Sequence, residues 1–153
     1  SGIHDAGGST GLALLRRDGF ASMDAGPEEG ILTTRPVTFA GKHLFVNVAA
    51  AGGELRVEVL DEAGKPIAPF TSANCKPVRA DKTLVPVTWR RAKDLSALAG
   101  KPVRFRFTLR NGSLYAFWVS PEKSGASHGY VAGGGPGFTG PTDTVGDKAL
   151  GGR

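Results

Sequence analysis

The sequence contains a single cysteine, Cys75, so the chain cannot form an intramolecular disulfide. A catalytic thiol needs a histidine to activate it, and no histidine lies near Cys75 in the sequence, so we interpret this residue as a buried structural thiol. No apolar run is long enough to cross a bilayer, so no membrane span is predicted. The chain begins without a methionine or a signal peptide, and we interpret Ser1-Gly2 as the remnant of a cleavage from a longer protein.

The sequence also lacks the motifs of common catalytic and metal sites. Its three histidines do not have the spacing of metal ligands, and most of its acidic residues lie in expected turns or on solvent faces rather than as a glycosidase pair. The glycine-rich run 133–137 is not followed by the lysine and the helix that a phosphate-binding loop needs. No cofactor is predicted, but a structural calcium stays open as an alternative, with Asp18 and Asp24 as its candidate ligands.

The charge of the chain is only moderately positive. There are 19 lysines and arginines against 14 aspartates and glutamates, which gives a formal net charge of +5. The basic residues are dispersed through the expected strands rather than gathered in one block, so ordinary solvation explains them. Nucleic-acid binding needs a basic patch interleaved with exposed aromatic residues, and the sequence does not predict that activity.

What the sequence does contain is a series of alternating β-strands, most clearly after residue 94. Asp94 and Ser96 can hydrogen-bond their own backbone and start a turn, and Gly100 can end it in the left-handed conformation. Beyond Pro102 apolar and polar residues alternate, which predicts a half-buried antiparallel strand. Its inward face consists of Val103, Phe105, Phe107 and Leu109, and its outward face of Arg104, Arg106, Thr108 and Arg110.

Similar short β-rich runs, separated by turn signals, recur along the chain without any long amphipathic helix. This pattern predicts an all-β fold, an antiparallel β-sandwich of the jelly-roll type, formed by residues 10–120. Residues 1–9 are expected to be a linker or a cleavage remnant. Residues 121–153 are rich in Gly, Pro, Ser and Thr, and two interpretations compete for them: a disordered tail, or an irregular extended arm that packs on the sandwich as far as Phe138 and is disordered toward its end.

Glycine-containing turns predict which strands are neighbours. A two-residue Asn-Gly, Asp-Gly or Gly-Gly loop between apolar runs is typical of a β-hairpin. The expected hairpin turns are Asp18-Gly19, Gly52-Gly53 and Asn111-Gly112. Each pair of flanking runs is therefore expected to lie side by side in one sheet.

The last of these strands, 114–119, is apolar on both of its faces. Strict alternation places Leu114, Ala116 and Trp118 on one face and Tyr115, Phe117 and Val119 on the other. One face must pack in the core, and the other needs a cover, a neighbouring domain or a ligand. Sugar rings stack on aromatic side chains while arginines bond their hydroxyls. The hairpin therefore predicts a carbohydrate-binding site made of Arg104, Arg106, Arg110, Tyr115 and Phe117.

Several segments resemble a known family. The segment 94–107 (DLSALAGKPVRFRF) resembles a recurrent segment of galactose-binding-like jelly-roll domains in secreted bacterial carbohydrate-active proteins. Over residues 12–120 the chain is similar to the C-terminal β-sandwich of large bacterial proteins related to glycoside hydrolase family 32. The matching segments are 17–26 (RDGFASMDAG), 33–36 (TTRP), 61–67 (DEAGKPI), 94–107 and 114–117 (LYAF).

The resemblance implies an accessory role, because the catalytic part of those proteins is a β-propeller that is not part of this sequence. It implies a non-catalytic domain of a secreted glycoside hydrolase, located outside the cell or in the periplasm. Its expected partners are a polysaccharide or oligosaccharide and the parent catalytic domain. The alternative is a purely structural module that packs on that catalytic domain and stabilises it.

Overall fold

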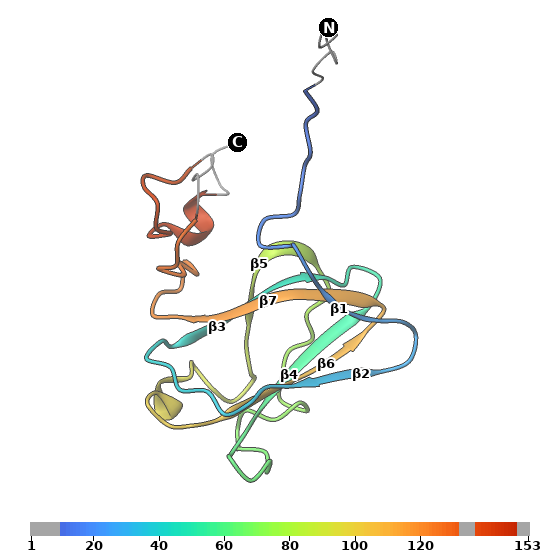
Figure 1. Ribbon diagram of the computed structural model, residues 1–153. Helices are drawn as coiled ribbons and strands as arrows, with labels where there is room; N and C mark the ends of the chain where they lie inside the picture. The colour runs from blue at the N-terminus through green and yellow to red at the C-terminus, as the bar shows by residue number, and fades with distance from the viewer. Residues whose placement is uncertain (1–9, 132–136, 150–153) are drawn as a thin grey trace, which may run out of the picture.

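The computed structural model describes residues 10–131 and 137–149, which form an all-β sandwich of two antiparallel sheets (Figure 1). This confirms the predicted fold class. The first sheet has the order β1 (Met23–Ala25), β7 (Gly112–Ser120), β3 (His43–Ala49), β5 (Asp81–Val87). The second has the order β2 (Gly30–Thr33), β6 (Arg104–Arg110), β4 (Glu54–Leu60). The helical elements of the described residues are two short 3-10 turns, η1 (Ser96–Leu98) and η2 (Gly146–Ala149).

The core lies between the two sheets, and β6 contributes to it as its alternation predicts. The side chains of Val103, Phe105, Phe107 and Leu109 are all buried. The turn before this strand also forms as expected. Asp94 Oδ1 accepts hydrogen bonds from the backbone N–H of Ser96 (2.9 Å) and from its hydroxyl (2.6 Å). Gly100 follows η1 with a φ of 75°, which favours glycine at that position.

The expected hairpin at Asn111-Gly112 is wrong, because β6 and β7 belong to different sheets. A tight type I′ hairpin needs positive φ at both central residues, and only Asn111 has it (φ 44°). Gly112 is already the first residue of β7 and lies against the end of β3. A Cβ at Gly112 would approach the Ala49 carbonyl oxygen to 2.6 Å, so the glycine serves a close packing contact rather than a turn.

The two other expected hairpins are also wrong. β3 pairs with β5 and β7, whereas β4 pairs with β6, so the chain crosses from one sheet to the other at Gly52-Gly53. At Asp18-Gly19 a turn does form, with Asp18 at a φ of 50° and a hydrogen bond of 2.9 Å from Gly19 N–H to the Arg16 carbonyl. No strands flank that turn directly, and β1 pairs instead with β7.

A β-bulge in β7 changes which of its residues face the core. Opposite β3, Ala116 pairs with Asn47 but Leu114 pairs with Val48, so Tyr115 is an extra residue without a counterpart. The expected face of Leu114, Ala116 and Trp118 is therefore wrong. Leu114 points inward together with Phe117 and Val119, and Trp118 points outward, where its ring stacks on that of Phe45 at 5.7 Å.

The outer face of the first sheet is covered by the N-terminal segment before β1 and by the arm after β7. From the N-terminal side, Arg16 Nε donates to Asn47 Oδ1 (2.6 Å), and Asn47 Nδ2 donates to the Arg17 carbonyl (2.7 Å). From the C-terminal side, Trp118 Nε1 donates to the Gly125 carbonyl (2.9 Å). Figure 1 shows both segments beyond β3 and β7, on the side away from β4 and β6.

The arm and the N-terminal segment also contact each other. The Arg17 guanidinium lies 4.3 Å from the centre of the Phe138 ring and 3.5 Å from the Asp143 carboxylate. Asp143 is only 1% exposed and accepts hydrogen bonds from the backbone of Ser127, Val145 and Gly146. No helix among the described residues is long and apolar enough to cross a membrane.

Candidate carbohydrate-binding groove

The five residues predicted as a carbohydrate site do not share a face. Arg104, Arg106 and Arg110 lie on the outer face of the second sheet, whereas Tyr115 and Phe117 belong to the first sheet. Phe117 packs inside the sandwich, with its ring centre 4.9 Å from that of Phe107. The grouping fails because it depended on the hairpin between β6 and β7.

Tyr115 and Arg104 have local partners of their own. The Arg16 guanidinium lies 4.7 Å from the centre of the Tyr115 ring, on the covered side of the first sheet. Arg104 donates to the carbonyl oxygens of Thr34 (3.2 Å) and Glu62 (3.3 Å), and so holds two connecting segments against the end of the second sheet. Both residues therefore stabilise the fold.

Arg106 and Arg110 line a groove of about 520 Å³ on the outer face of the second sheet. The strand period of two brings the outward side chains of β4 and β6 together along this face. Besides Arg106 and Arg110, the charged and hydroxyl-bearing residues that line the groove are Glu29, Glu54, Arg56, Glu58, Ser72 and Thr108. Aromatic residues do not line it, so the groove offers polar contacts rather than a stacking platform.

Opposite charges face each other across the groove. Glu58 is directly opposite Arg106 in the strand register, and Glu58 Oε1 lies 3.0 Å from Arg106 Nη1. Glu29 Oε2 lies 3.7 Å from Arg110 Nη2, and Glu54 forms ion pairs with Arg56 and with the exposed Arg79. Within the groove, three arginines thus accompany three glutamates.

The pKa of Glu54 follows from these partners. Partial burial of this carboxyl acts to raise its pKa, but the hydrogen bonds and positive charges of Arg56 and Arg79 outweigh burial and hold the pKa below its usual value. Glu54 therefore stays ionised and acts as a hydrogen-bond acceptor. A general acid of a glycosidase needs the opposite shift, a raised pKa.

The carboxylates of the groove were absent from the sequence-based site, although a signal for them exists. The alternation of β4 already places Glu54, Arg56 and Glu58 on one outward face. Alternation alone does not join them to Arg106 and Arg110, because the Gly52-Gly53 turn predicts that β4 pairs with β3. The pairing of β4 with β6 brings these residues of β4 next to Arg106 and Arg110.

The calcium candidates do not converge on a ligand set. Asp18 Oδ2 lies 3.6 Å from Arg17 Nε, and Asp24 Oδ1 accepts a hydrogen bond from the Ser22 hydroxyl. The residues that the structure describes contain no group of three or more acidic, histidine or cysteine side chains placed to hold a metal ion. Cys75 is buried, as expected, and burial raises the pKa of its thiol, which keeps it protonated and unreactive.

The chain matches no protein-family model, no curated protein and no solved structure. The fold defines its class as an antiparallel all-β sandwich. An assignment of function therefore depends on the surfaces that this sandwich presents.

Proposed function

We propose that this protein is a non-catalytic accessory domain of a carbohydrate-active enzyme and that it binds a glycan in the groove on the second sheet. The observation that carries the proposal is the groove itself, which has a volume of about 520 Å³ and is lined by both arginine donors and glutamate acceptors. Pockets of this size suit ligands of a few sugar rings.

The chemistry of the groove matches that of sugar hydroxyls. A hydroxyl both donates and accepts hydrogen bonds, and here it would meet guanidinium donors and carboxylate acceptors within one surface. The equal numbers of arginines and glutamates leave the groove without a net charge. This balance favours a neutral oligosaccharide over an acidic one.

The same proposal includes the parent protein and its location. The resemblance to the C-terminal sandwich of proteins related to glycoside hydrolase family 32 favours a bacterial glycoside hydrolase parent and a position outside the cell or in the periplasm. The strand order supports a jelly-roll arrangement, because successive strands such as β1 and β2, β3 and β4, and β6 and β7 alternate between the two sheets.

The test is affinity electrophoresis of the folded protein in gels that contain neutral or acidic polysaccharides. We expect at least one neutral polysaccharide to retard the protein, and we expect Arg106→Ala and Arg110→Ala to abolish the retardation. Arg35→Ala is the matched control, because Arg35 is exposed and does not line the groove. Absence of retardation in every gel would reject glycan binding.

A second candidate function is packing on a catalytic domain, and a different observation favours it. Large apolar side chains of the N-terminal segment are exposed, including Leu12 (88%), Leu14 (88%) and Phe20 (89%). Met23 and Ile31, on the adjoining edge strands β1 and β2, are also exposed. Such a set of exposed side chains is typical of an interface with another domain or protein.

Co-expression with the parent catalytic domain tests this second candidate. A stable complex in which hydrogen exchange slows over residues 12–23 would support it, and Leu14→Ser with Phe20→Ser should dissociate that complex. Arg106→Ala should leave the complex intact, because the groove lies on a different surface. Failure of the two domains to associate would reject interdomain packing without affecting the glycan proposal.

A further inference from the structure

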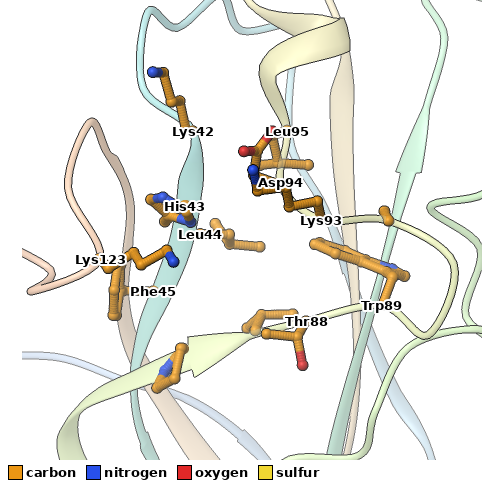
Figure 2. Close-up of a pocket in the computed structure, with 13 residues that line it drawn as sticks. Lys42, His43, Leu44, Phe45, Thr88, Trp89, Lys93, Asp94, Leu95 and Lys123 are labelled. Atoms are coloured by element: carbon orange, nitrogen blue, oxygen red, sulfur yellow. The ribbon is translucent and has the colours of Figure 1, made fainter.

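A second concavity lies at one end of the sandwich, away from the groove. It is a pocket of about 270 Å³ between the start of β3, the segment that follows β5, the loop before η1 and the beginning of the arm (Figure 2). The pocket is slightly smaller than a typical site for a drug-sized ligand, so it suits a group of about one ring.

The inner wall of the pocket is apolar and held in place. Trp89 contributes to it and is only 5% exposed. Its Nε1 donates to the Val57 carbonyl (3.0 Å), and its ring meets that of Phe70 edge-on at 5.5 Å. These contacts fix the orientation of the indole. The buried side chains of Leu44 and Val87 continue the apolar wall.

The rim of the pocket is positively charged. It carries Lys42, Lys93 and Lys123, and none of these three lysines forms an ion pair with another residue that the structure describes. Figure 2 shows His43 and Lys123 on one side of the pocket and Lys93 on the other. The Lys42 side chain extends away from the pocket (Figure 2), so a ligand there would lie between the ammonium groups of Lys93 and Lys123.

Asp94 is the acidic residue at this rim, and its carboxylate is already engaged. It accepts hydrogen bonds from the hydroxyl and the backbone N–H of Ser96, which are the main cause of its lowered pKa. The neighbouring charges of His43 and Lys93 lower that pKa further. Three lysines against one carboxylate leave a net positive rim even when His43 is neutral.

The backbone holds the two sides of the pocket at a set separation. Lys42 N–H donates to the Ser120 carbonyl (2.8 Å), and the Lys42 carbonyl accepts from Leu95 N–H (2.8 Å). These bonds tie the start of β3 to the end of β7 and to the loop before η1. A pocket that exists before the ligand arrives needs little ordering on binding.

We propose that this pocket binds a single anionic sugar unit, one that carries a carboxylate or a sulfate group. The acid group would be held by Lys93 and Lys123, Lys42 would add positive charge nearby, and the C–H face of the ring would lie over the apolar wall. A bare inorganic anion would leave that wall uncovered, and a neutral sugar would leave the ammonium groups of Lys93 and Lys123 without a partner. This site is separate from the groove and does not depend on it.

The test is an NMR titration of the protein with D-glucuronate, glucose 6-sulfate, glucose and inorganic sulfate. We expect the two anionic sugars to shift the Trp89 indole and the His43 backbone resonances in a saturable manner, and the other two compounds to leave them unchanged. The affinity should fall as salt is added, because the lysines of the rim are exposed. Equal shifts with inorganic sulfate would overturn the assignment of a sugar ligand.

Variants distinguish this pocket from the groove. The triple substitution Lys42→Gln, Lys93→Gln, Lys123→Gln should weaken binding of glucuronate roughly tenfold or more. The matched control is Lys65→Gln, Lys76→Gln, Lys82→Gln, which removes the same charge from exposed lysines outside the pocket.

The outcomes are separate for the two sites. Binding that persists in the pocket variant, or no binding of either anionic sugar by the folded protein, would overturn the proposal. Arg106→Ala with Arg110→Ala should leave glucuronate binding unchanged while it abolishes retardation by a neutral polysaccharide. Loss of glucuronate binding in that groove variant would also overturn the proposal.

Discussion

The two sheets of this sandwich use their outer faces differently. The outer face of the first sheet is covered by the chain itself, and the outward residues Phe45 and Asn47 of β3 are only 2% and 1% exposed. The outer face of the second sheet carries a groove of paired charges. The interior strand β3 of the first sheet is thus buried on both sides, whereas the second sheet keeps a polar surface in contact with solvent.

The difference is already present in the composition of the strands. β3 is a nearly continuous run of buried residues, as expected for a strand covered on both faces. β4 alternates buried apolar residues with Glu54, Arg56 and Glu58, as expected for a strand covered on one face. The outward charged side chains of β4 therefore line the groove on the second sheet.

The largest expected loss of stability is at Phe117, a residue that packs between the two sheets. Phe117→Ala removes an aromatic side chain packed against Phe105 and Phe107, and we expect it to lower the free energy of unfolding by about 3 kcal/mol. Urea denaturation measures this loss. Arg106→Ala is the comparison on the open face. A loss at Phe117 no larger than that at Arg106 would contradict the inward orientation of Phe117.

The next largest effect is expected on the docking of the arm that covers the first sheet. Asp143→Ala removes the acceptor of three backbone N–H groups and the partner of Arg17, and we expect the docking of the arm to weaken by about 2 kcal/mol. Hydrogen exchange should then accelerate over residues 122–131. Asp147→Ala, an exposed carboxylate in η2, is the control and should leave exchange unchanged. Equal protection in both variants would show that Asp143 does not hold the arm.

Acid should loosen the same cover. Burial acts to raise the pKa of Asp143, but hydrogen bonds from the backbone of Gly146, Ser127 and Val145 outweigh it and lower the pKa below its usual value. A carboxyl with a lowered pKa in the folded state stabilises that state above its unfolded pKa, and the stabilisation is lost as the pH falls. We expect arm protection to be full at neutral pH and to decline below about pH 4. In Asp143→Asn this decline should be absent.

The smallest effect on stability is expected in the groove. Glu58→Gln breaks its ion pair with Arg106, and we expect a change of less than about 1 kcal/mol in the free energy of unfolding because the pair is partly exposed. Thermal unfolding compares it with Glu28→Gln, an exposed position outside the groove. A loss of several kcal/mol would mean that this ion pair belongs to the framework of the sandwich rather than to a binding surface.

The fold class and the faces of β6 could be predicted because alternation is a local property. The pairing of strands could not be predicted, because a short turn can either join two neighbouring strands of one sheet or connect a strand to the other sheet. Gly52, Gly53 and Gly112 have the residue type of a hairpin turn, but none of them adopts a positive φ. The bulge at Tyr115 also has no sequence signal, yet it moves Leu114 to the core side.

The candidate site was predictable only in part for the same reason. Arg106 and Arg110 followed from the outward face of one strand. Glu54 and Glu58 needed the pairing of β4 with β6, which joins segments far apart in the chain. Arg104 shares the outward face with Arg106, but the carbonyl groups of connecting segments engage it, and such contacts leave no periodic pattern in a sequence.

The strand order has a consequence for how the chain reaches its native state. β1 pairs with β7, and β2 pairs with β6. Each of the first two strands therefore pairs with a strand near the end of the sandwich sequence. During synthesis on a ribosome, the second sheet cannot be completed until residue 110 has emerged, and the first cannot be completed until residue 120 has emerged. Folds dominated by such distant pairings fold slowly. The nascent chain therefore exposes unpaired strand edges for most of the synthesis of the sandwich, and we expect the sandwich to fold only after β7 has left the ribosome.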